Sequence, residues 1–235
     1  MSSPRRAALL LVALLLVALT ACSGGGGGSS GESAQQLLAR AKQTLDSAPT
    51  VHFQLSSGGA PTTGTLLTGG AGDIERPASF QGTLTVQVGG AGVDLKVISV
   101  NGTVYAQLPF APGYSVVDPA TFGFGDPGAL LDPKTGISQL LTAVQNPQLG
   151  PEKRSGGEVV REVTGDLPGS LVQKLLTSKD PSKPVHARFS IATGSGQLLQ
   201  VVLTGPFFTA TTDGTYTLQL SKYGADVSIT APPTS

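Results

Sequence analysis

The stretch that decides the fold is FQGTLTVQVGGAGVDLKVISVNGTVYAQL, residues 80–108. Apolar Leu84, Val86 and Val88 alternate with polar neighbours, which is the period of two expected of a strand with one buried face. The later pair Asn101-Gly102 favours a two-residue hairpin turn, because both turn residues need positive φ. The stretch therefore predicts three successive antiparallel strands with an apolar face that the rest of the chain must cover.

The composition agrees with a chain rich in strands. Among 235 residues there are 32 Gly and 17 Pro but only 13% charged residues, which favours strands and turns over long surface helices. The 15 basic and 15 acidic side chains give a net charge of zero. Contact with phosphates needs a basic surface, so we expect no nucleic-acid partner.

The remainder of the chain predicts more strands and three helices. Strand-like alternation recurs in residues 51–57, 64–74, 158–164, 185–192, 197–203, 214–220 and 225–230. Helical spacing of apolar residues occurs in residues 32–47, 137–144 and 168–176. A proline-punctuated segment with aromatics, residues 109–133, is expected to cover the core. The fold class is therefore α+β, with one large antiparallel sheet of about nine strands and helices on one face.

A sheet of this size curls strongly, and three short helices cover only part of its concave face. A cavity between the sheet and the helices is compatible with the sequence. A core filled by side chains would give the same periodicity, so the alternation of residues does not decide between the two.

The N-terminus has the pattern of a secretory signal peptide, residues 1–21. Arg5-Arg6 are followed by an apolar run, residues 7–19, which is short for a membrane span. The run ends in Leu19-Thr20-Ala21-Cys22, which resembles the bacterial lipobox. This resemblance implies cleavage before Cys22 and a diacylglyceryl thioether on its sulfur. Cys22 is the single Cys of the chain and has no partner for an internal disulfide.

The segments after the lipobox predict an anchored domain. Residues 22–31 comprise the lipidated Cys and a Gly/Ser linker, and residues 32–235 are expected to form a single domain. Several acyl chains on one residue hold a protein firmly on a bilayer. We therefore expect the protein at the outer face of the plasma membrane, in the cell envelope.

Residues for catalysis are scarce. A Ser–His–acid arrangement could draw only on His52 and His186, each in a predicted strand, and no G-x-S-x-G motif occurs. Asp126 and Asp132 are better explained as turn and cap residues than as an acid/base pair. The sequence predicts no enzyme, no metal site and no cofactor.

The chain resembles the LppX/LprG family of mycobacterial cell-envelope lipoproteins, and the matching motifs occur in the same order over nearly the whole mature domain. They are the lipobox and residues 82–90, 101–106, 132–137, 220–224 and 232–233. The resemblance implies a half-barrel of antiparallel strands with helices inside and a hydrophobic cavity for the acyl chains of envelope lipids or glycolipids. It also implies transport of such lipids away from the plasma membrane, in concert with a membrane exporter, and a place for Leu84 in the cavity wall.

The candidate wall residues are those of one parity on each strand. They are Val51, Phe53, Leu55, Leu84, Val86, Val88, Val93, Leu95, Val97, Phe189, Ile191, Val201 and Leu203. Each of them could equally be a packed core residue. The function expected from the resemblance is a lipid carrier, and the alternative is a scaffold lipoprotein that acts through its surface without a bound lipid.

Overall fold

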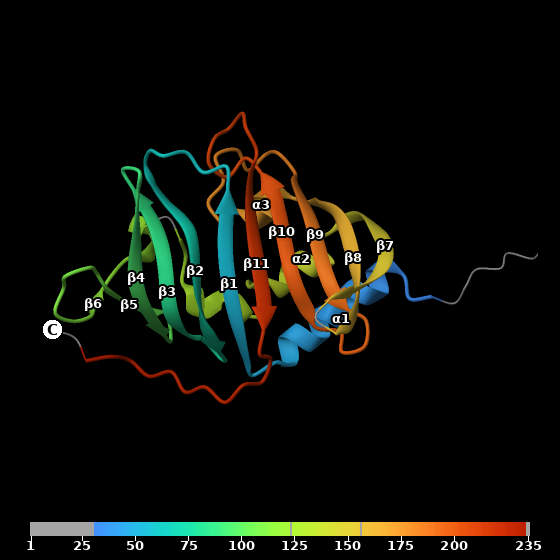
Figure 1. The fold of residues 1–235 in the computed structure, drawn as a ribbon, viewed down its shortest axis with the longest axis horizontal. Coiled ribbons are helices and arrows are strands. Elements are labelled where there is room, and N and C mark those ends of the chain that lie inside the picture. The colour runs from blue at the N-terminus through green and yellow to red at the C-terminus, as the bar shows by residue number, and fades with distance from the viewer. Residues whose placement is uncertain (1–30, 123, 156, 234–235) are drawn as a thin grey trace, which may run out of the picture. The chain divides into compact units, whose positions relative to one another are not determined.

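The computed structural model describes residues 31–122, 124–155 and 157–233. Its strands are β1 (Thr50–Gly58), β2 (Thr65–Glu75), β3 (Ser79–Val88), β4 (Ala91–Val100), β5 (Thr103–Gln107), β6 (Ser115–Val116), β7 (Gln145–Ser155), β8 (Glu158–Leu167), β9 (Val185–Ala192), β10 (Leu198–Gly205) and β11 (Gly214–Ser221). These strands form one antiparallel sheet in the order β6-β5-β4-β3-β2-β1-β11-β10-β9-β8-β7 (Figure 1). The predicted signal peptide, Cys22 and nearly all of the predicted linker lie outside the described residues.

The sheet consists of two meanders that meet at its centre. Strands β1 to β6 follow one another on one side, β7 to β11 on the other, and β1 pairs with β11 between them. In this central pair Phe53 lies opposite Leu220, and Leu55 lies opposite Leu218. The contact that joins the two halves is therefore a row of apolar cross-strand pairs.

The helices gather on one side of the sheet (Figure 1). They are α1 (Ala34–Ser47), α2 (Ser138–Thr142), α3 (Gly169–Val172) and the 3₁₀ helices η1 (Pro119–Phe122) and η2 (Pro127–Leu131). The predicted fold class is confirmed: an α+β fold in which a large curved antiparallel sheet, a half-barrel, holds helices on its concave face around a hydrophobic cavity. Residues 33–235 form one compact unit that contains the described hydrophobic core.

Helix α1 shows how the sequence specifies this packing. Ser33 and Gln36 form a capping box, in which the Ser33 hydroxyl accepts from the Gln36 N–H at 3.2 Å and the Gln36 amide oxygen accepts from the Ser33 N–H at 2.8 Å. The buried face includes Leu37, Leu38 and Leu45. The predicted helix is therefore confirmed, and its apolar stripe packs toward α2, β7 and β10.

The hairpin predicted at Asn101-Gly102 is present. Asn101 has φ 51° and Gly102 has φ 82°, the positive values that a tight hairpin between β4 and β5 requires. The glycine-rich part of β2 is irregular, because its pairing with β3 shifts register between Leu67 and Gly69.

Strand β7 was not predicted, and Pro147 was expected only to end the preceding helix. Pro147 and Pro151 both lie within β7, whose pairing with β8 shifts register twice. Proline lacks the N–H of a ladder bond and is tolerated mainly at sheet edges. Strand β7 is such an edge, so a proline-containing segment can still pair on its other side.

The strand predicted for residues 225–230 is wrong. The chain leaves β11, which already has β10 and β1 on its two sides, and no free edge is next to it. The segment instead runs along the ends of the central strands (Figure 1). It is held there by a bond from the Thr50 hydroxyl to the Ala225 carbonyl at 2.6 Å and one from the Ile229 N–H to Glu75 Oε2 at 2.9 Å.

Two further predictions need correction. The helix expected over residues 168–176 ends at Val172 and continues as turns. The segment of residues 109–133 covers the core at Val117, Phe122 and the buried Phe124, but not along its whole length. Phe110, in the first half, is fully exposed.

Candidate functional site

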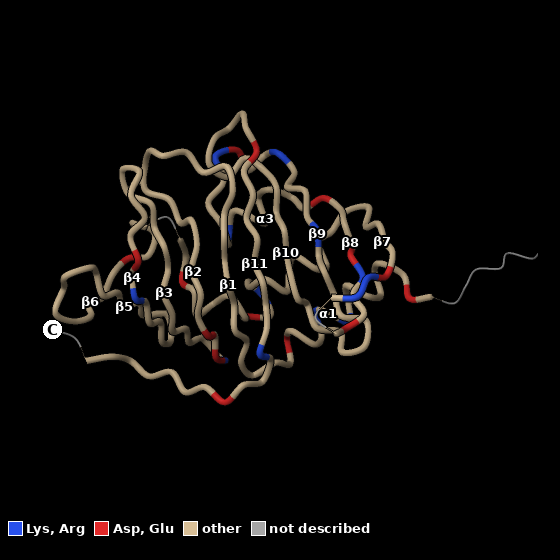
Figure 2. The backbone as a smooth tube through the Cα atoms, viewed as in Figure 1, with Lys and Arg blue, Asp and Glu red and all other residues tan. Residues whose placement is uncertain are grey.

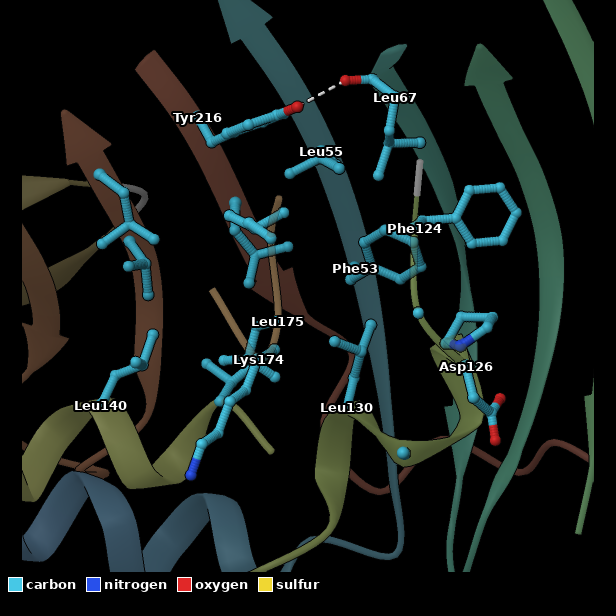
Figure 3. A pocket seen from close by; sticks show the side chains of 18 of the residues that line it. Phe53, Leu55, Leu67, Phe124, Asp126, Leu130, Leu140, Lys174, Leu175 and Tyr216 are labelled. Atoms are coloured by element: carbon cyan, nitrogen blue, oxygen red, sulfur yellow. Dashed lines mark hydrogen bonds between the residues drawn. The ribbon is translucent and has the colours of Figure 1, made fainter. Parts of the chain in front are cut away.

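An apolar cavity of about 350 Å³ lies between the concave face of the sheet and the segments that cover it (Figure 3). Its wall on the sheet side comes from five strands, β1, β2, β3, β10 and β11. The residues there are Phe53, Leu55, Leu67, Leu84, Val201, Leu203, Tyr216 and Leu218. Because side chains of one parity share a face of a strand, these eight residues point to the same side of the sheet.

We call the covering segments the cap, defined as residues 122, 124–140 and 174–176. The residues of the cap that line the cavity are Phe124, Gly125, Asp126, Pro127, Ala129, Leu130, Thr135, Ile137, Leu140, Lys174, Leu175 and Leu176. The two parts of the cap meet in a single antiparallel bridge between Phe124 and Leu176. The cap is therefore assembled from turns, the 3₁₀ helix η2 and the start of α2, with few backbone bonds to the sheet.

Asp126 fastens the cap to the sheet. Its Oδ1 accepts a hydrogen bond from the hydroxyl of the fully buried Ser99 on β4 at 2.5 Å, and another from the N–H of Gly128 at 2.8 Å. The second bond caps η2, which is the role predicted for this residue. Gly128 lies so close to β3 and β4 that a Cβ there would come within 2.9 Å of the Ala78 carbonyl oxygen. The predicted capping role of Asp132 is also present, in the turn that follows η2.

The other polar side chains at the cavity are few. The Tyr216 hydroxyl donates to the Leu67 carbonyl at 2.7 Å, as the dashed line in Figure 3 shows, and burial raises the pKa of Tyr216 well above its ordinary value. Its phenol thus stays protonated and its ring faces the cavity. Lys174 and Thr135 are exposed and line the cavity from the cap. The arrangement offers an apolar interior in which the charged side chains, Asp126 and Lys174, lie only on the covering side.

Five of the thirteen predicted wall residues line this cavity: Phe53, Leu55, Leu84, Val201 and Leu203. Seven others lie in the surrounding core without lining it, namely Val51, Val86, Val93, Leu95, Val97, Phe189 and Ile191. Val88 is 48% exposed at the end of β3 and reaches neither the cavity nor the core. Strand parity identifies the buried face, but the position of the cap decides which part of that face stays open.

Sequence reasoning missed three wall residues on strands and all those of the cap. Leu67 lies beside the register shift of β2, which interrupts the alternation that would have revealed it. Tyr216 and Leu218 have the right parity on β11 and could have been found by the same rule as the other strands. The cap residues lie in the segment expected to cover the core, residues 109–133, and in or beside the helices predicted over residues 137–144 and 168–176, but no signal in the sequence places them at the cavity.

The chain is similar to known proteins over nearly all of its described part. The family model described as "LppX_LprAFG lipoprotein" matches residues 33–229. The chain belongs to this family. Membership in the LppX_LprAFG family confirms the resemblance on which part of the sequence analysis was based, and it associates the chain with lipoproteins of the mycobacterial cell envelope.

Two curated members of the family have low sequence identity to this chain. The lipoarabinomannan carrier protein LprG of Mycobacterium tuberculosis is 25% identical over 173 residues, which are 70% of this chain and 68% of LprG. Lipoprotein LprA of the same organism is 26% identical over 210 residues, 85% of this chain and 81% of LprA.

Solved structures in the family share the fold. The crystal structure of LprF from Mycobacterium bovis superposes with a TM-score of 0.68 at 21% identity, covering 88% of this chain and 100% of LprF. LppX from Mycobacterium tuberculosis superposes with a TM-score of 0.60 at 21% identity, covering 84% of this chain and 98% of LppX.

The described residues contain neither a membrane-spanning helix nor a cluster of metal-binding side chains. None of the helices between residues 31 and 233 that the structure describes is long and apolar enough to cross a membrane. The same described part of the chain contains no group of three or more His, Cys, Asp or Glu side chains placed to hold a metal ion.

Proposed function

We propose that the protein is a membrane-anchored lipoprotein that binds an acylated lipid or glycolipid in the cavity and carries it from the plasma membrane towards the outer cell envelope. The observation that carries this proposal is the cavity itself. Aliphatic and aromatic side chains line its sheet side, and the two charged groups, Asp126 and Lys174, stand on the cap. This is the distribution that a molecule with an apolar tail and a polar headgroup requires.

The energetics explain why such a carrier needs no catalysis. A lipid with two chains of about 16 carbons would expose apolar surface worth ~20–25 kcal/mol in water, at ~0.8 kcal/mol per CH₂. Spontaneous transfer through water is therefore very slow. An apolar cavity offsets this cost by replacing contacts with water by contacts with side chains such as Phe53, Leu84 and Val201.

The volume of the cavity limits the number of acyl chains that it can hold. A cavity of about 350 Å³ lies at the lower end of the range of ligand pockets, ~300–1,000 Å³. A ligand with two chains would need more room, and the cap is the element that can provide it, because short turns move at lower cost than a paired sheet. We infer that Asp126, Thr135 and Lys174 face the headgroup while the tails lie against the strands.

The name of one relative supports the proposal. LprG is described as a lipoarabinomannan carrier, and the family model covers residues 33–229 of this chain. The exact lipid need not be the same, because identity to LprG is only 25%. We propose the class of ligand, an acylated lipid or glycolipid, and a membrane exporter as the partner in its transport.

The anchor is the second part of the proposal. Residues 1–21 are proposed to be a signal peptide, Cys22 the lipidated residue, residues 23–31 a flexible linker and residues 32–235 the lipid-binding domain. Cys22→Ala should move most of the protein from the membrane fraction to the soluble extracellular fraction without changing lipid binding by the domain. Retention of the variant in the membrane fraction to the same extent as the wild type would show that the anchor lies elsewhere.

A transfer assay tests the carrier function. Donor vesicles contain a fluorescent phospholipid with a quencher, acceptor vesicles contain neither, and the domain of residues 33–235 is added in the aqueous phase. We expect the rate of fluorescence recovery to rise in proportion to the protein concentration. A rate equal to that without protein would contradict lipid transport, whatever the cavity contains.

A further inference from the structure

The connection from β5 to β6 presents an aromatic side chain entirely to solvent. Phe110 has a relative exposure of 106%, the highest among the large apolar residues in the described chain. Leu108 in the same turn is 44% exposed, and Val116, in β6, is 63% exposed. We call residues 108–111 the β5–β6 tip. Large apolar side chains clustered on a projecting loop, and not scattered singly, commonly mark a contact surface.

The backbone of the tip makes this exposure more unusual. The N–H of Ala111 donates to the carbonyl of Leu108 at 3.0 Å, which closes a four-residue turn with Pro109 in its second position. Phe110 occupies the third position with φ 68°. Positive φ at this place is the type II arrangement, which favours Gly or Asn and is strained for a bulky side chain.

The fold therefore accepts two unfavourable features at one residue. Phe110 holds a strained φ and leaves its whole ring in water, and neither adds a contact within the chain. Glycine would relieve the strain and remove the exposed ring. Strain retained at an exposed position points to a contact outside the chain.

The chemistry of the surroundings favours a bilayer over a protein as that contact. Residues 107–117 contain no charged side chain, and the loop of β6 is uninterrupted tan in Figure 2. A four-residue turn is too small to bury the ~1,000 Å² typical of a specific protein interface. Insertion into the interfacial layer of a membrane needs only a protruding uncharged tip with apolar side chains.

We propose that the β5–β6 tip inserts into the surface of a lipid bilayer and gives the protein a membrane contact independent of a lipid anchor. Strand β6 forms one edge of the sheet, and α1, through which the chain enters the domain, contacts β7 at the other edge. Measured along the curved sheet, ten strand spacings of ~4.8 Å place these edges roughly 48 Å apart. The β6 edge is therefore the end of the domain that lies far from α1, where the chain enters. A contact at this edge would bring that end onto a membrane.

The absence of Trp from the sequence gives a direct test. Phe110→Trp in the unit of residues 33–235 places the only indole at the tip. With vesicles of phosphatidylglycerol and phosphatidylethanolamine, its emission should shift to the blue and be quenched by brominated lipid. The matched control is Val88→Trp, at a residue that is 48% exposed on the end of β3. Its emission should not change. An unshifted spectrum of Phe110→Trp would overturn the proposal.

A second variant separates membrane binding from folding. Phe110→Gly suits the positive φ of the turn and should fold at least as stably as the wild type, yet partition into the same vesicles at least tenfold more weakly. Because the contact is apolar, wild-type binding should persist in high salt. Equal partitioning of both proteins would contradict the proposal. A second outcome would also contradict it: a wild-type protein that forms a dimer but binds no vesicles, and a Phe110→Gly variant that is a monomer. The tip would then bind a second copy of the chain.

Discussion

Leu84 on β3 lies directly opposite Gly70 on β2, and a Cβ at position 70 would come within 2.7 Å of Leu84 Cδ2. The absence of a side chain at Gly70 thus provides the space that the Leu84 side chain occupies at the wall of the cavity. A larger side chain at position 84 would fill that space and then extend into the cavity. Position 84 is therefore well suited to test what the cavity holds.

Leu84→Trp should reduce lipid loading more than tenfold while the domain remains folded. The indole would occupy the room intended for an acyl chain, and overpacking should lower the stability by about 1–3 kcal/mol. Loading is measured by mass spectrometry of the purified domain and folding by circular dichroism. The matched control is Val93→Trp, on the same face but outside the cavity, which should load normally. Normal loading of Leu84→Trp would refute the assigned wall.

Tyr216→Phe should destabilise the domain by about 1–3 kcal/mol. The Tyr216 hydroxyl reaches across β1 to the carbonyl of Leu67, beside the register shift of β2, and the variant leaves that carbonyl without this donor. Urea unfolding at neutral pH measures the change. An unchanged unfolding midpoint would mean that the bond contributes nothing to stability.

Two buried tyrosines predict a loss of stability at alkaline pH. Burial raises the pKa of both Tyr216 and Tyr223 in the folded state, and Tyr223 donates to the Leu198 carbonyl at 2.6 Å. Above the unfolded pKa of about 10 the unfolded chain releases these protons and the folded chain keeps them, so the free energy of unfolding falls as pH rises.

The slope of that loss is testable. Each of the two tyrosines contributes up to about 1.4 kcal/mol per pH unit between pH 10 and its raised folded pKa. Urea unfolding between pH 9 and 11 should show the decline, and Tyr223→Phe should make it shallower. The same slope in Tyr223→Phe as in the wild type would show that Tyr223 does not contribute to it.

Asp126→Ala should loosen the cap. The variant removes the acceptor for the buried Ser99 hydroxyl and the cap of η2, which should cost about 1–3 kcal/mol and speed the exchange of bound lipid. Exchange is followed by displacement of a fluorescent fatty acid. Asp180→Ala removes similar turn bonds to Ser182, distant in sequence from Asp126, and should leave exchange unchanged. Equal exchange rates in Asp126→Ala and the wild type would show that this residue does not hold the cap.

Much of the sheet could be predicted from the sequence, because alternation and turn residues are local signals. The bounds of β9 and the hairpin at Asn101-Gly102 follow directly from them. The failures have a shared cause in tertiary context. Strand β7 contains two prolines that only an edge position tolerates, and residues 225–230 look like a strand but have no free edge to join. The edge position of β7 and the lack of a free edge for residues 225–230 can be known only from the order of the strands in the sheet.

The site was predictable only in part for a related reason. Parity places Phe53, Leu84 and Val201 on the buried face, and all three line the cavity. Leu95 and Phe189 have the same parity but lie in the packed core outside the cavity. Much of the cap consists of turns and the 3₁₀ helix η2, whose packing has no periodic signature.

The most direct test of the account is the content of the cavity. The unit of residues 33–235, without Cys22, is expressed in a host with mycobacterial lipids, purified without detergent and analysed by native and denaturing mass spectrometry. We predict one equivalent of an acylated lipid or glycolipid that dissociates on denaturation and is absent from Leu84→Trp. A folded wild-type domain that carries no lipid, and takes up none from vesicles, would contradict the proposed function.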